Sequence, residues 1–224
     1  MHLQKDKKIL IYCFLFIFLG SINNKYFTEL ELFNIKSFNF VGLDKKEKLE
    51  LLKKLEPIRN QNIFSVSNQQ IIEILNSNDL IDSFLIRKNY PSNLNFNIKK
   101  ASFLANINIQ GRNFLIGSNK KLIKADLKNS NLPMVLGNPS LDDFFQITES
   151  ISKSLIKLKD VNKFHFFKSK RWDLEFKNGI LIKLPVSNTV EALNNFSKLV
   201  DLKQFNNTKI FDLRINKQII VNEL

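Results

Sequence analysis

The sequence predicts an α+β fold: a single N-terminal transmembrane helix, a β-α-α-β-β module, and then a mixed β-sheet module with flanking helices. Three observations support this prediction. Residues 9–22 form the only long uncharged apolar run of the chain. Several short segments alternate apolar and polar residues, which is typical of half-buried strands. Other segments repeat apolar residues every three or four positions, which is typical of amphipathic helices.

The apolar run 9–22 follows a lysine cluster at Lys5, Lys7 and Lys8. As a helix it extends about 21 Å, which is short against a hydrocarbon core of roughly 30 Å. This length also fits the core of a cleaved signal peptide. The residues before Gly20 and Ser21 are bulky, however, and a cleavage site needs small ones. We therefore expect an uncleaved anchor over residues 9–26, a cytoplasmic tail over 1–8, and the bulk of the chain outside the cytoplasm.

Composition restricts the chemistry of the remaining chain. Cys13, the only cysteine, lies inside the apolar run, so the rest has no disulfide and no thiol nucleophile. The only histidines are His2 and His165. The net charge of +13 comes mostly from scattered lysines rather than clustered arginines, which argues against base-specific recognition of nucleic acid. We expect no cofactor, no metal and no small-molecule substrate.

Residues 31–100 predict the order strand, helix, helix, strand, strand. Capping-box patterns at Asp44–Glu47 and Ser67–Gln70 open the two helices. Pro57 ends the first helix, and Asn76–Asn78 end the second. The expected strands are 35–41, 81–88 and 94–98, and the last two are joined by a turn at Pro91.

Residues 101–224 predict a second module that is richer in strands. Its expected extended segments are 101–109, 114–116, 132–137 and 161–167, with helices over 142–159 and 189–200, and a terminal strand or hairpin over 210–215 and 218–221. Residues 171–185 predict a hairpin. A three-residue loop ending at Gly179 pairs Leu174 with Ile182 and sets Asp173 opposite Lys183, whereas a two-residue loop mixes apolar and charged faces.

The motifs of both modules resemble known domains. The segments FNFVG at 38–42, NIFSV at 62–66 and IRKNYPSNLNFNI at 86–98, in this order, resemble a POTRA domain over residues 31–100. The segments RWDLEFKNGILIKLP at 171–185 and FDLRINKQIIV at 211–221, with the helix between them, resemble the C-terminal β domain of the FtsQ/DivIB bacterial cell-division family over residues 101–224.

This resemblance implies a non-enzymatic scaffold that recruits and connects divisome proteins at the septum. It implies a single-pass protein of the inner membrane whose bulk lies in the periplasm, and FtsB, held with FtsL, as the partner. An added partner strand would pair with the last strands, and Arg171 would meet an acidic partner residue. The implied docking residues are Arg171, Arg214, Ile215, Lys217, Ile219, Ile220 and Val221.

Two other function classes remain as alternatives. A peptidoglycan-associated envelope enzyme would need a catalytic group, and Asp142–Asp143 is the only adjacent acidic pair past residue 31, with no nucleophile motif beside it. A POTRA-containing envelope assembly factor would need a C-terminal barrel of many alternating strands.

Overall fold

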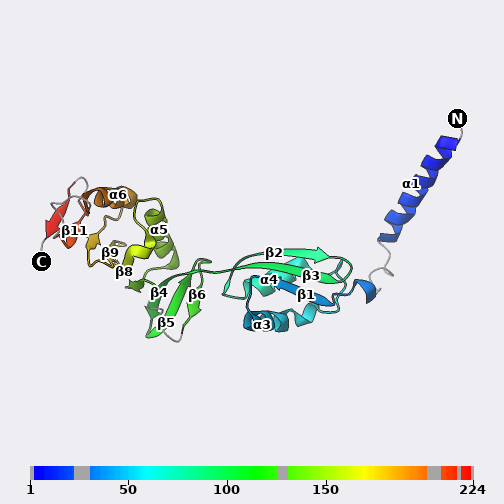
Figure 1. The fold of residues 1–224 in the computed structure, drawn as a ribbon, viewed down its shortest axis with the longest axis horizontal. Helices are drawn as coiled ribbons and strands as arrows, with labels where there is room; N and C mark the ends of the chain where they lie inside the picture. The colour runs from blue at the N-terminus through cyan, green and yellow to red at the C-terminus, as the bar shows by residue number, and fades with distance from the viewer. Residues whose placement is uncertain (1–2, 23–30, 126–130, 201–207, 216–217, 223–224) are drawn as a thin grey trace. The chain divides into compact units, whose positions relative to one another are not determined.

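The computed structural model describes residues 3–22, 31–125, 131–200, 208–215 and 218–222 (Figure 1). The chain divides into two compact units, Met1–Lys100 and Ala101–Leu224. Helices and strands are mixed in both units, so the predicted α+β class is confirmed.

Helix α1 (Leu3–Ile22) contains the apolar run. Among the described residues, no helix is both long and apolar enough to cross a membrane. The prediction of a transmembrane helix is corrected on this point. Although α1 has 20 residues, its first two turns carry Lys5, Asp6, Lys7 and Lys8, and these charges leave too short an apolar stretch before Ile22. Residues 23–26 of the predicted anchor lie outside the described residues.

The remainder of the first unit has the predicted order of strand, helix, helix, strand, strand. Its three-stranded sheet has the order β1-β3-β2, in which β1 runs parallel to β3 and β2 antiparallel to it. The elements are η1 (Glu31–Phe33), β1 (Ser37–Val41), α3 (Lys45–Leu55), η2 (Glu56–Ile58), α4 (Asn68–Asn76), β2 (Ile81–Asn89) and β3 (Asn93–Lys100).

Helix caps and one apolar face of the sheet account for how this unit folds. The Asp44 carboxylate accepts the N–H of Glu47 at 2.9 Å, and Glu47 accepts the N–H of Asp44 at 3.0 Å, so the predicted capping box is confirmed. Ser67 caps α4 by accepting the N–H of Gln70. The helices then bury one side against alternate residues of β3, and this core includes Leu51, Leu55, Ile71, Leu75, Leu94, Phe96 and Ile98.

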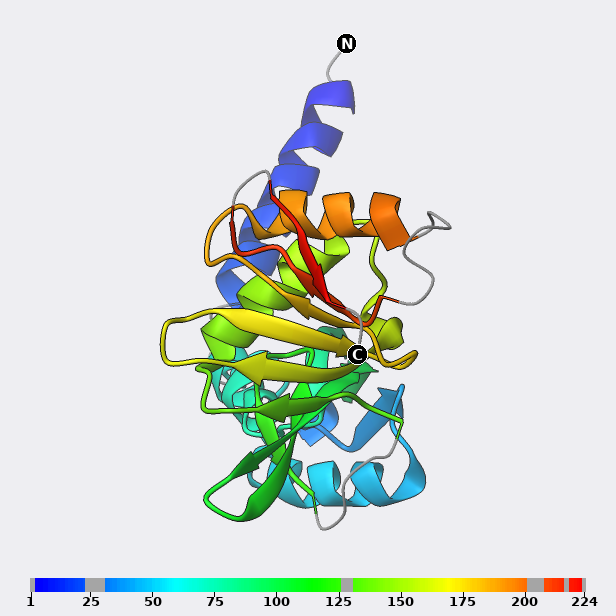
Figure 2. The same cartoon turned by 90° about the vertical axis from the view of Figure 1, so that its left-hand side faces the viewer.

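The described part of the second unit contains a nine-stranded mixed sheet of order β12-β11-β10-β9-β8-β7-β4-β5-β6 (Figure 2). Helices α5 and α6 pack their apolar residues into the same core as the sheet. The elements are β4 (Phe103–Ile109), β5 (Arg112–Gly117), β6 (Leu122–Lys124), β7 (Met134–Leu136), α5 (Leu141–Ser152), η3 (Leu158–Asp160), β8 (Val161–Phe166), β9 (Trp172–Phe176), β10 (Leu181–Lys183), α6 (Thr189–Val200), β11 (Ile210–Asp212) and β12 (Ile220–Asn222).

The hairpin of β9 and β10 has the predicted three-residue register. Leu174 lies opposite Ile182, and Asp173 lies opposite Lys183. The N–H of Phe176 donates to the carbonyl of Ile180 at 2.8 Å, which closes the loop. Gly179 has a φ of +86°, as a bulged loop of this length requires.

Helix α5 is shorter than the sequence predicts. It ends at Ser152 rather than Lys159. The hydroxyls of Ser152 and Ser154 donate to carbonyls of the last turn, and the N–H of Leu155 donates to the Asn194 side chain of α6 at 3.0 Å. These bonds replace the helical ones, so Leu155 and Leu158 lie outside the helix.

Two glycines of the second unit provide a matched stability test. Gly137 (φ +92°) and Gly179 (φ +86°) both have the left-handed conformation. A Cβ on Gly137 would lie 2.4 Å from the carbonyl oxygen of Phe166, whereas one on Gly179 would meet nothing within 4 Å. We expect Gly179→Ala to lower the free energy of unfolding by about 1 kcal/mol through backbone strain alone. Gly137→Ala should lower it clearly more in urea unfolding, and equal losses would contradict this packing.

Candidate functional site

Strand β12 forms one edge of the nine-stranded sheet. It pairs antiparallel with β11, with Phe211 opposite Val221 and Asp212 opposite Ile220. Among the described residues, no strand pairs with its other side. An unpaired edge presents backbone donors and acceptors to any extended segment that reaches it.

The hydrogen bonds of β11 show which backbone groups face this edge. Lys209 accepts the N–H of Leu181 at 2.8 Å, and Leu213 donates to the carbonyl of Lys183 at 2.9 Å, so both residues direct their backbone groups toward β10. Backbone groups alternate in direction along a strand. The two even-numbered residues of β11, Ile210 and Asp212, therefore direct theirs toward β12.

The same alternation applies to β12. Ile220 and Asn222 lie opposite Asp212 and Ile210, so their backbone groups face β11. Val221, which lies between them, directs its N–H and C=O away from β11. The open edge thus presents one donor and one acceptor at Val221.

Apolar side chains surround this backbone position. The exposed fractions are 52% for Ile215, 37% for Ile219, 50% for Ile220 and 38% for Val221. Four exposed aliphatic residues in or near a strand with one open edge are unfavourable in water, and they are typical of a surface that a partner covers.

A row of alternating charges crosses three strands and ends at this edge. Asp173 of β9 lies opposite Lys183 of β10, Lys183 lies opposite Asp212 of β11, and Asp212 lies opposite Ile220. Arg171 donates its Nε to Asp173 at 3.1 Å and lies 4.2 Å above the Phe167 ring. Arg171 thus contacts the β9 end of this row, and the terminal segment lies at its other end.

The two carboxylates of the row have opposite pKa shifts. Burial raises the pKa of Asp173, and the nearby charges of Arg171, Lys183 and Arg214 offset this only in part. The pKa of Asp212 is lowered because Arg214 donates to it from the side chain, at 2.8 Å from Nε, and from the backbone at 3.1 Å.

The predicted docking residues do not all lie in one strand. Only Ile220 and Val221 belong to β12, which pairs antiparallel with β11, so the hairpin of the two expected alternatives is the one present, with shorter strands than 210–215 and 218–221. Arg214 and Ile215 follow β11, and Ile219 directly precedes β12. Lys217 lies outside the described residues.

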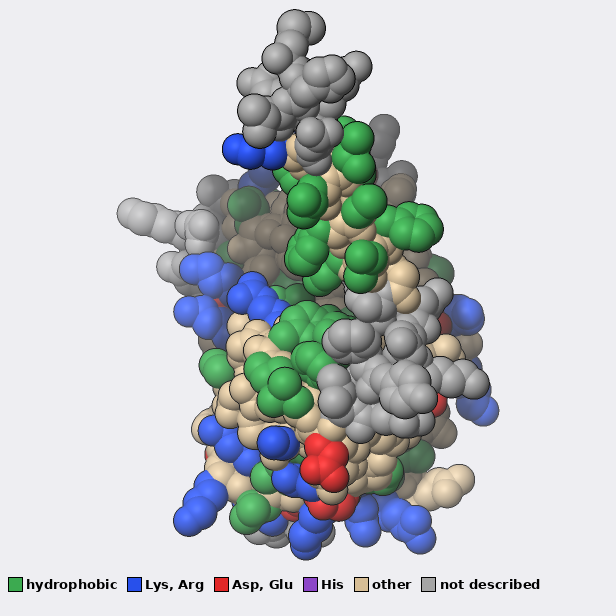
Figure 3. Space-filling model, turned by 90° about the vertical axis from the view of Figure 1, so that its right-hand side faces the viewer, with side chains coloured by type: hydrophobic (Ala, Val, Ile, Leu, Met, Phe, Trp, Pro, Cys, Tyr) green, Lys and Arg blue, Asp and Glu red, His purple; other side chains and the backbone are tan. Residues whose placement is uncertain are grey.

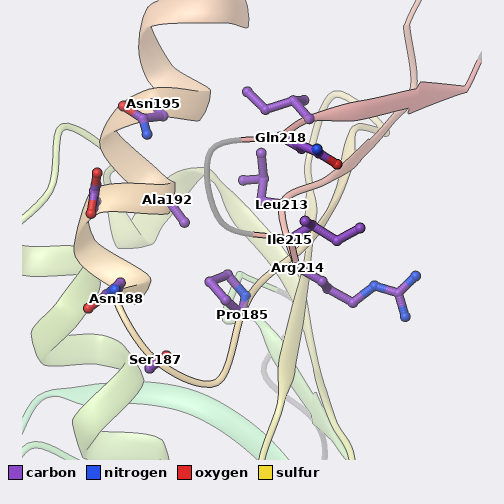
Figure 4. Close-up of a pocket in the computed structure, with 11 residues that line it drawn as sticks. Pro185, Ser187, Asn188, Ala192, Asn195, Leu213, Arg214, Ile215 and Gln218 are labelled. Atoms are coloured by element: carbon purple, nitrogen blue, oxygen red, sulfur yellow. The ribbon is translucent and has the colours of Figure 1, made fainter.

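No local sequence pattern indicates the pocket that lies beside this edge. A cavity of about 200 Å³ lies between α6 and the segment that connects β11 to β12 (Figure 4). Pro185, Ala192 and Leu213 provide apolar walls, and Asn188 and Gln218 add amide groups. One wall comes from residues 185–195 and the other from residues 213–215 and 218–219. Because these segments are far apart in the sequence, no local motif could have indicated the pocket.

The residues weighed for catalysis have structural roles. Asp143 accepts the backbone N–H of Ser140 at 3.1 Å and completes the capping box of α5, and Asp142 lies in the same first turn. His165 lies 3.5 Å from Glu175 across adjacent strands. In the parts of the chain that the structure describes, no three His, Cys, Asp or Glu side chains are arranged to hold a metal ion.

The family comparison matches the second unit. A family model described as "Cell division protein FtsQ/DivIB, C-terminal" matches residues 105–214. The Cell division protein DivIB of Clostridium botulinum is 27% identical over 207 residues, which cover 91% of this chain and 75% of that protein. The chain belongs to the FtsQ/DivIB family.

Two further likenesses accompany this match. The FtsQ/DivIB chain is 27% identical over 195 residues to the Cell division protein FtsQ of Rickettsia bellii, covering 85% of this chain and 73% of that protein. The solved extracytoplasmic domain of DivIB from Geobacillus stearothermophilus covers 47% of this chain and 96% of its own, at 13% identity and a TM-score of 0.35.

The charge row predicts different outcomes for two isosteric replacements. We expect Asp212→Asn to lower the free energy of unfolding by about 1 kcal/mol near neutral pH, because it loses charge-assisted bonds from Arg214. The lowered pKa of Asp212 means that this stabilisation is present above its ordinary value of 3.8 and is lost as the pH falls through the folded pKa.

Asp173→Asn should lower the free energy of unfolding less than Asp212→Asn does near neutral pH, or should raise it. The raised pKa of Asp173 means that its protonation stabilises the fold at low pH, and that this stabilisation is lost as the pH rises from 3.8 through the folded pKa. Urea unfolding of both variants between pH 3 and pH 7 measures the difference. A larger loss for Asp173→Asn near neutral pH would contradict the assignment of the shifts.

Proposed function

We propose that this protein is a non-enzymatic scaffold of the cell-division machinery, which connects other division proteins at the septum by accepting a partner strand at β12. The observation that carries the proposal is the open edge itself. Val221 presents its backbone groups there, beside exposed aliphatic residues, and Arg214 bonds to Asp212 at the near end of the charge row. Membership of a family of cell-division proteins supports this role.

Strand addition would use this edge in a defined way. A partner strand would bond to the N–H and C=O of Val221 and extend the sheet beyond β12. Its side chains would alternate between the two faces, so that one set would lie beside Val221 on the Phe211 face. The other set would lie beside Ile220 on the charged face, where Arg214 favours an acidic residue. Arg171 adjoins β9, three strands from β12, and would meet an acidic residue of the partner outside the added strand. The resemblance names an FtsB-like strand, held with FtsL, as the partner.

The enzyme alternative has less support in the described structure. Asp143 is engaged in a helix cap, and His165 pairs with Glu175 on the sheet. The similar proteins are named cell division proteins rather than enzymes. An envelope assembly factor of the POTRA type remains the other binding-protein alternative, and it would not depend on the β12 edge.

Helix α1 belongs to the same proposal. Its large apolar side chains from Ile9 to Leu19 are 46 to 79% exposed, which is costly in water. We place this surface in contact with lipid, where the preceding lysines favour anionic headgroups.

A proline at Val221 tests the strand addition. Val221→Pro removes the outward N–H and leaves the N–H groups that bond to β11, because these belong to Ile220 and Asn222. We expect the full-length chain in detergent to bind a purified FtsB–FtsL pair at least tenfold more weakly, with thermal unfolding almost unchanged. Val221→Thr retains the N–H and serves as the matched control. Unchanged affinity of Val221→Pro would place the docking site elsewhere.

A charge reversal at Arg171 tests the acidic contact. Arg171→Glu alone would place a second carboxylate beside the buried Asp173, so a loss of binding could reflect local misfolding. The test therefore uses the double variant Arg171→Glu with Asp173→Asn, against Asp173→Asn as control. We expect the reversal to weaken binding by about 2–5 kcal/mol if the pair is buried in the complex. Equal affinities of the double variant and its control would remove Arg171 from the interface.

A further inference from the structure

Three segments of the first unit form an aromatic cluster at one end of its sheet. Phe33 comes from η1, Phe64 from the segment between η2 and α4, and Tyr90 from the turn between β2 and β3. The Phe33 and Phe64 rings lie 5.2 Å apart, and the Phe64 and Tyr90 rings are stacked at 4.8 Å. The N–H of Ile63 donates to the carbonyl of Phe33 at 2.8 Å, which fixes two of the three segments together.

This cluster is solvent-exposed although it is apolar. The exposed fractions are 56% for Phe64 and 57% for Tyr90, and the neighbouring Leu32 is 59% exposed. Phe33 packs against the core of the first unit, whereas Phe64 and Tyr90 do not belong to that core. Phenyl and phenol rings gathered with a leucine are typical of residues at the boundary between lipid and water.

The sheet topology places the cluster at the end of the unit where the chain enters from α1. Strands β1 and β3 begin at this end and β2 finishes there, because β1 is parallel to β3 and β2 is antiparallel to it. The opposite end holds Val41 and Lys100, where the chain leaves for the second unit. Nine residue steps separate Ile22 from Glu31, and an extended chain of that length spans at most about 30 Å.

The apolar surface of α1 therefore lies within reach of the cluster along the chain. Figure 3 shows the apolar side chains gathered along this helix. If α1 contacts lipid, the end of the first unit that carries the cluster cannot lie far from the same membrane.

Basic groups adjoin the cluster. Lys36 bonds through its N–H to the carbonyl of Ser92 in the turn, at 2.9 Å, and Arg59 donates to the carbonyl of Lys36 at 3.3 Å. The Nζ of Lys88 donates to the carbonyls of Ile63 and Val66 on either side of the Phe64 segment. The acidic groups near the cluster on these elements are Glu31 and Glu56, and Glu56 pairs with Arg59, whereas Asp82 lies at the opposite end of β2 near Lys99. This balance favours an anionic surface.

We propose that the cluster of Leu32, Phe33, Phe64 and Tyr90 rests on the surface of an anionic phospholipid bilayer and holds the first unit against it. This inference goes beyond the docking function, which concerns the far end of the chain. It rests on the placement of α1 in contact with lipid. The test below distinguishes contact of the cluster with lipid from contact with a protein partner.

Tryptophan reporters test the contact. The full-length chain is reconstituted into vesicles of phosphatidylethanolamine and phosphatidylglycerol, with or without brominated acyl chains that quench tryptophan emission. Phe64→Trp reports on the cluster. Val41→Trp is the matched control, because Val41 is 64% exposed at the opposite end of the sheet. Trp172, which is 7% exposed in the second unit, gives both variants the same background.

We expect brominated lipid to quench Phe64→Trp at least twofold more than Val41→Trp, and 0.5 M salt to reduce the difference. Tyr90→Trp is a second reporter in the same cluster. It replaces Phe64→Trp if that variant has a lower unfolding temperature than the unmodified chain. Equal quenching at both ends of the sheet, or none at either, would overturn the proposal and leave the cluster to a protein partner. The FtsB–FtsL affinity measured in detergent is independent of this result, so the two proposals fail separately.

Discussion

The second unit depends on one constraint, the burial of a single face of the nine-stranded sheet beneath α5 and α6. Residues of seven adjacent strands, from β11 to β5, form one core with the two helices, including Phe164, Leu174, Ile182 and Phe211. Side chains alternate between faces along a strand, so a shift of one residue in any strand would expose its apolar set. Burial of one face therefore fixes the register of the strands in this core, and with it the positions of their polar groups on the other face.

The candidate docking edge follows from this register. Because Phe211 must face the core, Asp212 lies on the open face beside Lys183, and the charge row can form. The same alternation of backbone groups along β11 and β12 directs those of Val221 away from β11. The proposed docking surface is thus a consequence of how the core packs, and its charges and its open backbone groups cannot move independently of one another.

Local patterns predicted much of this fold. The capping box at Asp44 and Glu47 and the register of the hairpin at Gly179 were predictable, because their bonds join residues close in sequence. The end of α5 was not, because the Asn194 side chain that receives the N–H of Leu155 comes from another helix. Strand β6 is too short for an alternation of apolar and polar residues to be recognised. The pairing of Arg171 with buried Asp173 was also missed, and it changes how a substitution at Arg171 must be interpreted.

Amide hydrogen exchange at β12 tests the central claim most directly. In the free protein, the N–H of Val221 should exchange faster than those of Ile220 and Asn222, which face β11. Addition of the FtsB–FtsL pair should slow exchange at Val221 at least tenfold, because a partner carbonyl then accepts its N–H. Protection that appears elsewhere in the second unit while Val221 still exchanges at its free rate would contradict docking by strand addition at this edge.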